Sequence, residues 1–202
     1  MAQPDTWSEV AKIAIAAQAG ADVPFEAITE TVDIDIGNKD FDVIATLSGG
    51  RLVKYTPQEP TTITLEAYPV EAGTSSGTTG KGFFDLLNSA DTSQPITVSV
   101  DHARNKYRLA VLWSDAILNT TGVNAEGQIV SPTNSCLRVV ASDGYFTSVK
   151  PSYTDGILKF TVTYKVPPFD KNGAANVKIE SLDGSSTATL TALASYTSAT
   201  KW

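Results

Sequence analysis

The sequence has a single cysteine, Cys136, and a single histidine, His102, and this scarcity excludes several kinds of site. No disulfide can form within the chain, and the two residues cannot supply the Cys₂His₂ or His₃ ligands of a zinc site. A Cys–His catalytic pair would need both, yet Cys136 begins an apolar strand pattern, where a buried structural cysteine is the ordinary case. No Gly-x-Ser-x-Gly motif is present. We expect a protein that is not an enzyme, although a carboxylate pair for glycoside hydrolysis stays open because its spacing is three-dimensional.

Charge is also scarce. Charged residues make up 18% of the chain, against roughly 25% in ordinary globular domains, and 15 Lys plus Arg face 22 Asp plus Glu for a net charge of −7. Nucleic-acid-binding proteins gather cations to neutralise phosphates, so this balance argues against a stable nucleic-acid complex. It fits a surface past which DNA moves without binding, and equally a charge that only keeps the protein soluble.

Membrane and nucleotide-binding signals are missing as well. No stretch approaches the ~20 apolar residues of a membrane span, and no basic region precedes the first apolar run as in a signal peptide. We expect no membrane partner and synthesis in the cytoplasm. The loop Gly77–Gly82 lacks the Ser or Thr that must follow Lys81 in a phosphate-binding loop, so no cofactor is expected.

The first pattern with a clear period predicts a helix over about 6–20. Thr6 can act as N-cap with Glu9 three residues on, and Gly20 supplies a stop. Apolar residues recur at helical spacing on one face, at Trp7, Val10, Ala11, Ala14 and Ala17. We expect this helical arm to pack against a sheet; docking on a neighbouring subunit is the alternative.

Most of the remaining chain alternates with a period of two, which is typical of strands. We expect strands over 28–36 and 41–47, joined as a hairpin through the turn Gly37-Asn38-Lys39. Gly49-Gly50 turns the chain again toward expected strands 52–55 and 61–70, and 83–88 suits a short helix. Expected strands 96–103 and 107–113 form a hairpin that turns near 104–106.

The C-terminal third is predicted to be a meander. Asp155-Gly156 lies between expected strands 145–154 and 157–166, and Asp183-Gly184 between 177–182 and 187–196. Asp-Gly between alternating segments is a strong hairpin signal. Residues 71–82 and 114–134 are predicted as long loops. The sequence therefore predicts one domain over 1–202, an antiparallel β sandwich or barrel with one principal α-helix.

Two local concentrations of charge are candidates for function. Asp33, Asp35, Asp40 and Asp42 lie close to the turn of the predicted 28–47 hairpin, and Asp33 and Asp35 share a strand face. They suit a solvated surface, the acidic wall of a water-filled channel, or a calcium site. The second concentration is basic and surrounds the turn of the 96–113 hairpin; it suits a contact with an acidic edge of a neighbouring subunit or a solvated hairpin tip, and comprises His102, Arg104, Lys106 and Arg108.

One long stretch, Phe41 to Thr74, resembles the major tail proteins, which are the tail-tube subunits of tailed viruses. The likeness lies in a strand pair that leads through Gly49-Gly50-Arg51 into the strand Pro57-x-x-Pro60-Thr-Thr-Ile-Thr, followed by a long Gly/Ser/Thr loop. The segments 107–115 and 159–169 are similar in style to the same family.

This resemblance implies a virion structural protein with a tail-tube fold that assembles with itself. Family members form rings, commonly hexameric, whose sheets join edge to edge around an acidic lumen through which DNA passes without binding. It implies as further partners the tape measure, terminator and baseplate proteins. Asp33, Asp35, Asp40 and Asp42 would then suit the lumen. The loop at 71–82 would suit ring stacking, with Gly73, Thr74, Ser75, Ser76, Gly77 and Lys81 as candidate residues.

Other functions stay open beside this one. An exported adhesin or carbohydrate-binding β-sandwich would use an exposed aromatic platform, with Trp113, Trp202, Tyr145 and Tyr153 as candidates, although Trp113 ends an apolar strand and is expected in the core. A virion shell or decoration protein is a nearer alternative, and so is a subunit of a bacterial secretion tube.

Overall fold

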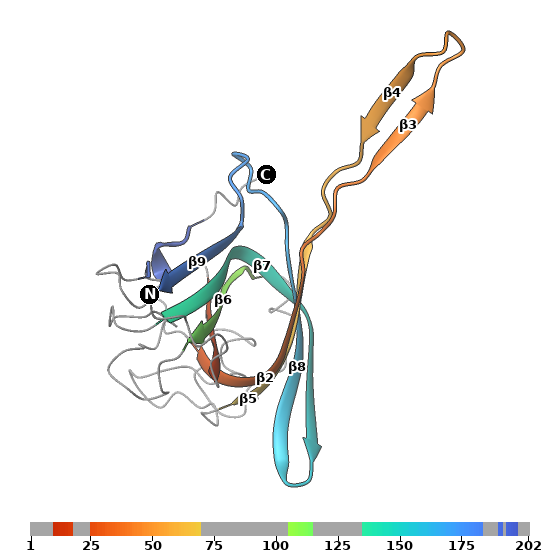
Figure 1. Cartoon of the computed structure of the whole chain (residues 1–202). Coiled ribbons are helices and arrows are strands. Elements are labelled where there is room, and N and C mark those ends of the chain that lie inside the picture. Colours follow the sequence, from red (N-terminus) through yellow and green to blue (C-terminus); the bar gives the residue numbers. More distant parts are fainter. Residues whose placement is uncertain are drawn as a thin grey trace.

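The computed structural model describes residues 10–17, 25–69, 105–114, 135–183, 190–191 and 193–197, and the statements below concern these residues. Strands dominate them, with a single turn of 3₁₀ helix, η2, at Leu193–Ser195. Figure 1 shows a body of curved strands from which two hairpins project in opposite directions. The strands are β1 (Val10–Ala17), β2 (Phe25–Asp35), β3 (Phe41–Ala45), β4 (Arg51–Tyr55), β5 (Thr61–Pro69), β6 (Tyr107–Ser114), β7 (Ser135–Thr154), β8 (Ile157–Val166) and β9 (Val177–Asp183).

The body is one antiparallel sheet that closes on itself. Its strand order is β6-β1-β2-β5-β8-β7-β9, and β6 also pairs with β7, so the hydrogen-bonded strands return to their start. The 20-residue β7 makes this possible, because its first half pairs with β6 and β9 and its second half with β8 (Figure 1). The predicted antiparallel β class is confirmed.

An aromatic group forms the centre of the barrel interior. The ring of Phe146 lies between those of Tyr107 and Tyr164, with centroids 5.1 Å away on each side. The buried Tyr164 hydroxyl donates to the Tyr107 carbonyl oxygen at 2.8 Å, and burial raises the pKa of Tyr164. Gly144 lies directly against the Tyr164 ring, where a Cβ would have no room. The surrounding buried residues are Ile13, Ile15, Ile63, Leu65, Leu109, Val111, Ala141, Phe160, Val162 and Val166.

The predicted helix over about 6–20 is wrong for residues 10–17, which form β1. Ile13 and Ile15 point into the barrel, whereas Ala14 between them packs outside against Leu193 and Tyr196 of the C-terminal segment. A strand that is covered on both faces shows no polar alternation. Its run of small and apolar residues therefore fits a helical period as well, and pairing with β2 and β6 decides the outcome.

The predicted 28–47 hairpin is also wrong, although both of its strands exist. β2 pairs with β5, and β3 pairs with β4 around a turn at Gly49, so the four strands are two successive parts of one long hairpin. Gly37 does not make a turn. A Cβ there would overlap the backbone of Glu59, so this glycine is needed for the close approach of the two chains.

The predicted C-terminal hairpins have different outcomes. The first is confirmed: β7 and β8 pair up to Thr154 and Ile157, and Asp155 and Gly156 both have positive φ, at 54° and 80°. The second is wrong in its pairing, because β9 pairs with β7 and the expected strand over 187–196 contains η2. The expected strand at 107–113 is confirmed as β6. The predicted elements at 83–88 and 96–103 and the loops at 71–82 and 114–134 lie outside the described residues.

We expect the substitution Gly156→Ala to destabilise the protein by about 1 kcal/mol, because φ at this position is 80° and a side chain there is strained. Urea unfolding followed by circular dichroism measures the change. Asp155→Asn is the matched control, since asparagine tolerates positive φ and should leave the midpoint unchanged. Equal midpoints for both variants would contradict the role of the turn.

Candidate assembly surfaces

A four-stranded part of the barrel wall has one face in the core and one polar face. It comprises the second half of β2, then β5, β8 and the second half of β7. In β5 the side chains of Thr61, Ile63 and Leu65 are buried and those between them are half-exposed. The polar face is therefore built mainly of short hydroxyl side chains with charges among them, and comprises Asp33, Asp35, Thr62, Thr64, Glu66, Ser148, Lys150, Lys159, Thr161, Thr163 and Lys165.

Both lateral edges of this four-stranded sheet are open within the described part of the chain. Residues 31–35 of β2 pair only with β5, since β1 reaches no further than Ile28. Residues 145–154 of β7 pair only with β8, because the β6 pairing ends at Gly144. Open edges present unpaired N–H and C=O groups and are templates for another strand. These two edges are the first candidate assembly surface.

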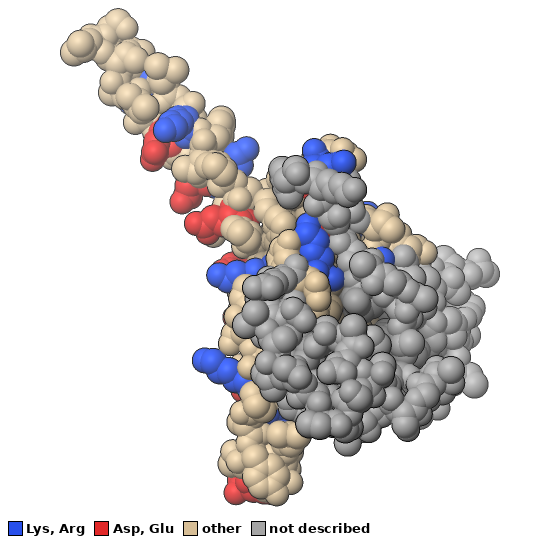
Figure 2. Space-filling view, turned by 180° about the vertical axis from the view of Figure 1, so that it is seen from behind, with Lys and Arg blue, Asp and Glu red and all other residues tan. Residues whose placement is uncertain are grey.

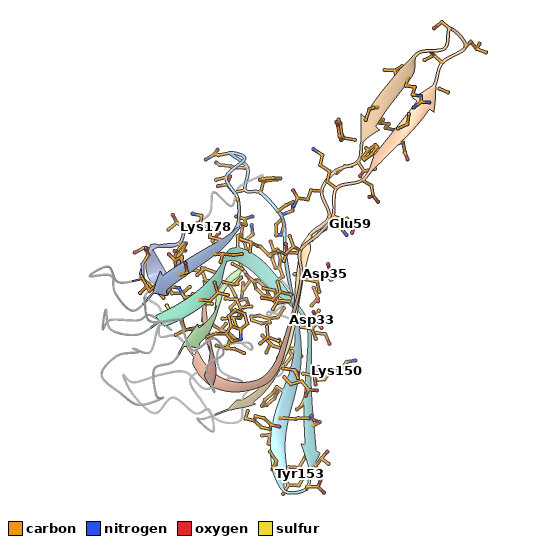
Figure 3. The ribbon with its side chains drawn as sticks, in the orientation of Figure 1. Asp33, Asp35, Glu59, Lys150, Tyr153 and Lys178 are labelled. Atoms are coloured by element: carbon orange, nitrogen blue, oxygen red, sulfur yellow. The ribbon has the colours of Figure 1, made fainter. Side chains whose placement is uncertain are left out.

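Charges of opposite sign lie at the two edges of the polar face. Asp33 and Asp35 share the exposed face of β2, as the sequence predicted, while the exposed Lys150 lies on β7. Between them Lys159 donates to Glu66 at 3.1 Å. Figure 3 draws Asp33, Asp35 and Lys150 on the same side of the ribbon. Figure 2 shows acidic side chains gathered where the β3–β4 hairpin leaves the body. Basic side chains lie between this group and the opposite end of the molecule. The face is thus mixed in sign.

The projecting hairpin, formed by β3, β4 and their turn and called the arm below, is the second candidate surface (Figure 1). Register places Phe41 opposite Tyr55 and Val43 opposite Val53 on one face, which we call the apolar stripe. All four side chains are 46–64% exposed. The rings of Phe41 and Tyr55 lie 6.3 Å apart. An isolated two-stranded hairpin is marginally stable in water, so the arm has the properties of a docking element.

The arm separates the four predicted aspartates into two groups. Asp40 lies at its base, where the Thr56 hydroxyl donates to the Asp40 carbonyl oxygen at 2.8 Å. Asp42 lies directly opposite Lys54 on the face away from the apolar stripe. Only Asp33 and Asp35 belong to the body of the sheet. The lumen assignment of the four residues stays a prediction.

At the far end of the molecule from the arm, the tip of the β7–β8 hairpin also exposes apolar side chains. Tyr153 is 73% exposed, and Ile157 and Leu158 are also exposed. Figure 1 shows the arm and this tip at opposite ends of the structure. The two exposed apolar regions therefore cannot cover each other within one subunit.

The predicted basic hairpin is engaged within the chain as far as the structure describes it. Lys106 donates to the buried Asp143 at 2.9 Å and lies over the Tyr145 ring, 5.6 Å from its centroid. Arg108 is 5% exposed. His102 and Arg104 lie outside the described residues. The contact with a neighbouring subunit stays a prediction.

Sequence reasoning missed a buried ionic cluster that holds the C-terminal segment against the outside of the barrel. The guanidinium of the fully buried Arg138 donates to Glu180, with an Nε–Oε2 distance of 2.8 Å, and to the Thr191 carbonyl oxygen. The Tyr196 hydroxyl donates to Glu180, and burial together with this carboxylate raises the pKa of Tyr196. An arginine inside the apolar run Cys-Leu-Arg-Val-Val was the available signal, since a buried charge needs a partner.

The other candidate sites are not brought together. Cys136 is buried against Leu112 and Leu190, and His102 is not described. Among the described residues, no group of three or more His, Cys, Asp or Glu side chains is placed to hold a metal ion. Trp113 packs against the core, as expected. Tyr145 and Tyr153 lie eight positions apart on β7 and form no common platform with it.

Of the candidate stacking residues, all of 73–77 and Lys81 lie outside the described part of the chain; their role stays a prediction. Trp202 is outside it as well. In the part that the structure describes, no helix has the length and apolar character needed to cross a membrane.

Comparison with known proteins gave matches at the level of structure only. No protein-family model matches the chain, and no curated protein matches its sequence. A sheath–tube complex of the extracellular contractile injection system PVC aligns at 14% identity and TM-score 0.43, covering 90% of this chain and 93% of its own. The PVC sheath/tube terminator aligns at 17% identity and TM-score 0.41, and the alignment covers 89% of this chain and 99% of the terminator chain. The tube-terminating cap of the anti-feeding prophage aligns at 16% identity and TM-score 0.40, and the alignment covers 89% of this chain and 92% of the cap chain.

Proposed function

We propose that this protein is a structural, non-enzymatic subunit of a viral tail tube, which assembles into rings that stack around a lumen for DNA. One observation carries the proposal: a polar-faced sheet of four strands is open at both lateral edges in the described chain. Neighbouring strands of this sheet run in opposite directions from β2 to β7. Because its strand number is even, β7 of one copy meets β2 of a rotated copy antiparallel, and the sheet continues around a ring.

The difference between the two faces of this sheet supports the choice of the side that lines the lumen. The core face is occupied by the barrel interior, so the polar face with its Thr, Asp and Lys side chains is the one left to line a water-filled channel. The acidic side chains Asp33, Asp35 and Glu66 balance the basic Lys150, Lys159 and Lys165 on this wall, so it offers DNA no excess of cations for phosphate binding. Asp33 and Asp35 belong to this wall, whereas Asp40 and Asp42 lie at or on the arm, outside it.

The arm supplies the contact between rings. Its apolar stripe and the β7–β8 tip lie at opposite ends of the molecule (Figure 1). A head-to-tail contact between such ends is heterologous, and its repetition stacks rings into an open tube. The proposed partners are six copies in each ring, further rings, and the tape measure, terminator and baseplate proteins; the proposed location is the virion tail, with synthesis in the host cytoplasm.

Electron microscopy of the purified protein tests this proposal. We expect concentrated protein, incubated over time, to form stacked rings or hollow tubes of uniform diameter in negative stain. A cryo-EM map of them should show one continuous sheet across the subunit joints. Closed shells would instead indicate a capsid or decoration protein. A protein that remains monomeric at high concentration and binds a glycan array would be an adhesin module, and either result would overturn the tube.

A further inference from the structure

The two open edges of the polar sheet carry opposite charges, and this complementarity points to a specific contact. We infer that Lys150 of one copy pairs with the acidic edge of the next copy, Asp33 and Asp35, and thereby sets the register of the joint between subunits. The inference rests on the proposed function, since it concerns the joint between two copies of this chain.

Neither charged edge is used by another part of the chain that the structure describes. The side chains of Asp33, Asp35 and Lys150 are all exposed, and among the described residues none of them forms an ion pair. Three strand spacings of about 4.8 Å separate the two edges, so β2 and β7 lie roughly 14 Å apart in one copy. Two further basic side chains lie on β8, one strand in from the β7 edge: Lys159, which is already paired with Glu66, and Lys165, opposite Tyr145. The edge charges are therefore available to a neighbour.

The register of the sheet shows which residues would meet. Cross-strand partners form rows that run from β2 to β7. One row is Thr31, Glu66, Thr161 and Lys150, and the next is Asp33, Thr64, Thr163 and Ser148. Lys150 thus lies one row, or two residues, from the row of Asp33.

A neighbouring copy brings these rows together. With the rows continued unshifted, Lys150 lies opposite Thr31 of the next copy and diagonal to its Asp33, which a long side chain can reach. Strands in a closed barrel are staggered. A stagger of two residues places Lys150 directly opposite Asp33, and a stagger of four places it opposite Asp35. In each case, the basic side chain of one copy meets an acidic side chain of the other.

The expected role of this pair is to select the register. Exposed ion pairs contribute little net stability, but like charges directly opposite one another destabilise a strand pair, and complementary charge raises association rates and suppresses wrong partners. A slip of the joint in the direction opposite to these staggers would move Lys150 along β2 away from Asp33 and Asp35 and lose the attraction. Because a ring repeats the joint at every subunit, one reversed charge acts at all of them.

A charge-reversal experiment with mixing tests the contact. One variant carries Asp33→Lys with Asp35→Lys and has two cationic edges; the other carries Lys150→Glu and has two anionic edges. At low salt we expect each alone to assemble at least tenfold more slowly than the wild type, by light scattering and negative stain. An equimolar mixture should recover assembly, because each cationic edge of one variant meets an anionic edge of the other. A ring with an even number of subunits can close with the two variants in alternation. Lys171→Glu, an exposed turn residue away from the edges, is the matched control.

The possible results separate the two proposals. Circular dichroism and thermal unfolding of the monomers must show that the variants fold, and any that do not are replaced by Asp33→Asn with Asp35→Asn and Lys150→Gln, for which a smaller slowing is expected. Wild-type tubes with variants that assemble at the normal rate, or a mixture no faster than its components, overturn the ion pair and leave the tube intact. A wild type that never forms rings overturns both.

Discussion

Threonine in place of all four residues of the apolar stripe, Phe41, Val43, Val53 and Tyr55, is expected to leave rings that no longer stack into tubes. Each of these side chains is at least 46% exposed in the subunit, so each has apolar area to bury against a neighbouring ring. Full burial of such a side chain contributes about 1.5–3 kcal/mol; about half of that is left to gain from a half-exposed one, and each 1.4 kcal/mol is about tenfold in affinity. Four losses per subunit should weaken stacking by about a hundredfold or more.

Negative-stain microscopy and sedimentation velocity separate the outcomes, because rings and tubes differ widely in size. Threonine preserves strand propensity, and the stripe is exposed in the subunit, with Lys39 Nζ lying over the Tyr55 ring at 5.2 Å. The thermal midpoint of the monomer should therefore stay within a few degrees of the wild type. The matched control is Asp42→Asn with Lys54→Gln on the opposite face of the arm, which should still form tubes. Tubes of normal length from the stripe variant would show that stacking uses another surface.

The second large effect is expected at the ionic cluster. Glu180→Ala leaves the fully buried Arg138 without its carboxylate and Tyr196 without its acceptor. Breaking a buried pair from one side costs about 3 kcal/mol or more, so urea unfolding should show a loss of that size. Glu66→Ala is the control, because its pair with Lys159 is partly exposed on both sides and should cost less than about 1 kcal/mol.

The chain carries its own reporter of where this loss acts. Cys136 is the single cysteine, and it is buried beneath Leu190 of the C-terminal segment that the cluster holds. Thiol labelling in Glu180→Ala should therefore become faster under native conditions, since the segment detaches more often. Unchanged labelling together with lowered global stability would locate the effect in the barrel instead of the segment.

The alternation of apolar and polar residues made single strands predictable from the sequence, whereas the pairing of strands with one another was not predictable. The Asp155-Gly156 turn was found because its chemistry is local: two positive φ angles admit few residue types. The pairing of β3 with β4 was missed because Gly37, which admits the Glu59 backbone, has the same sequence appearance as a turn glycine. Strand β1 was mistaken for a helix because it is covered on both faces by parts of the chain far away in sequence.

The candidate surfaces divide in the same way. That Asp33 and Asp35 share an exposed face follows from strand period alone. That Asp33 and Asp35 lie at one edge of the sheet and Lys150 at the other depends on the order of four strands in the sheet. No local sequence pattern predicts this order. Arg138 could be recognised as needing a partner, but Glu180 was identifiable only once β9 lay beside β7.

The asymmetry between the arm and the β7–β8 tip bears on how long the assembled structure becomes. In the proposed tube, each added ring would cover one set of arms and present a fresh, identical set, so every step of growth would be the same as the one before. Such a subunit would carry no information about when to stop. If the tube forms as proposed, its length would have to be set by a different molecule, and its two ends, one with bare arms and one with bare tips, would need two different caps.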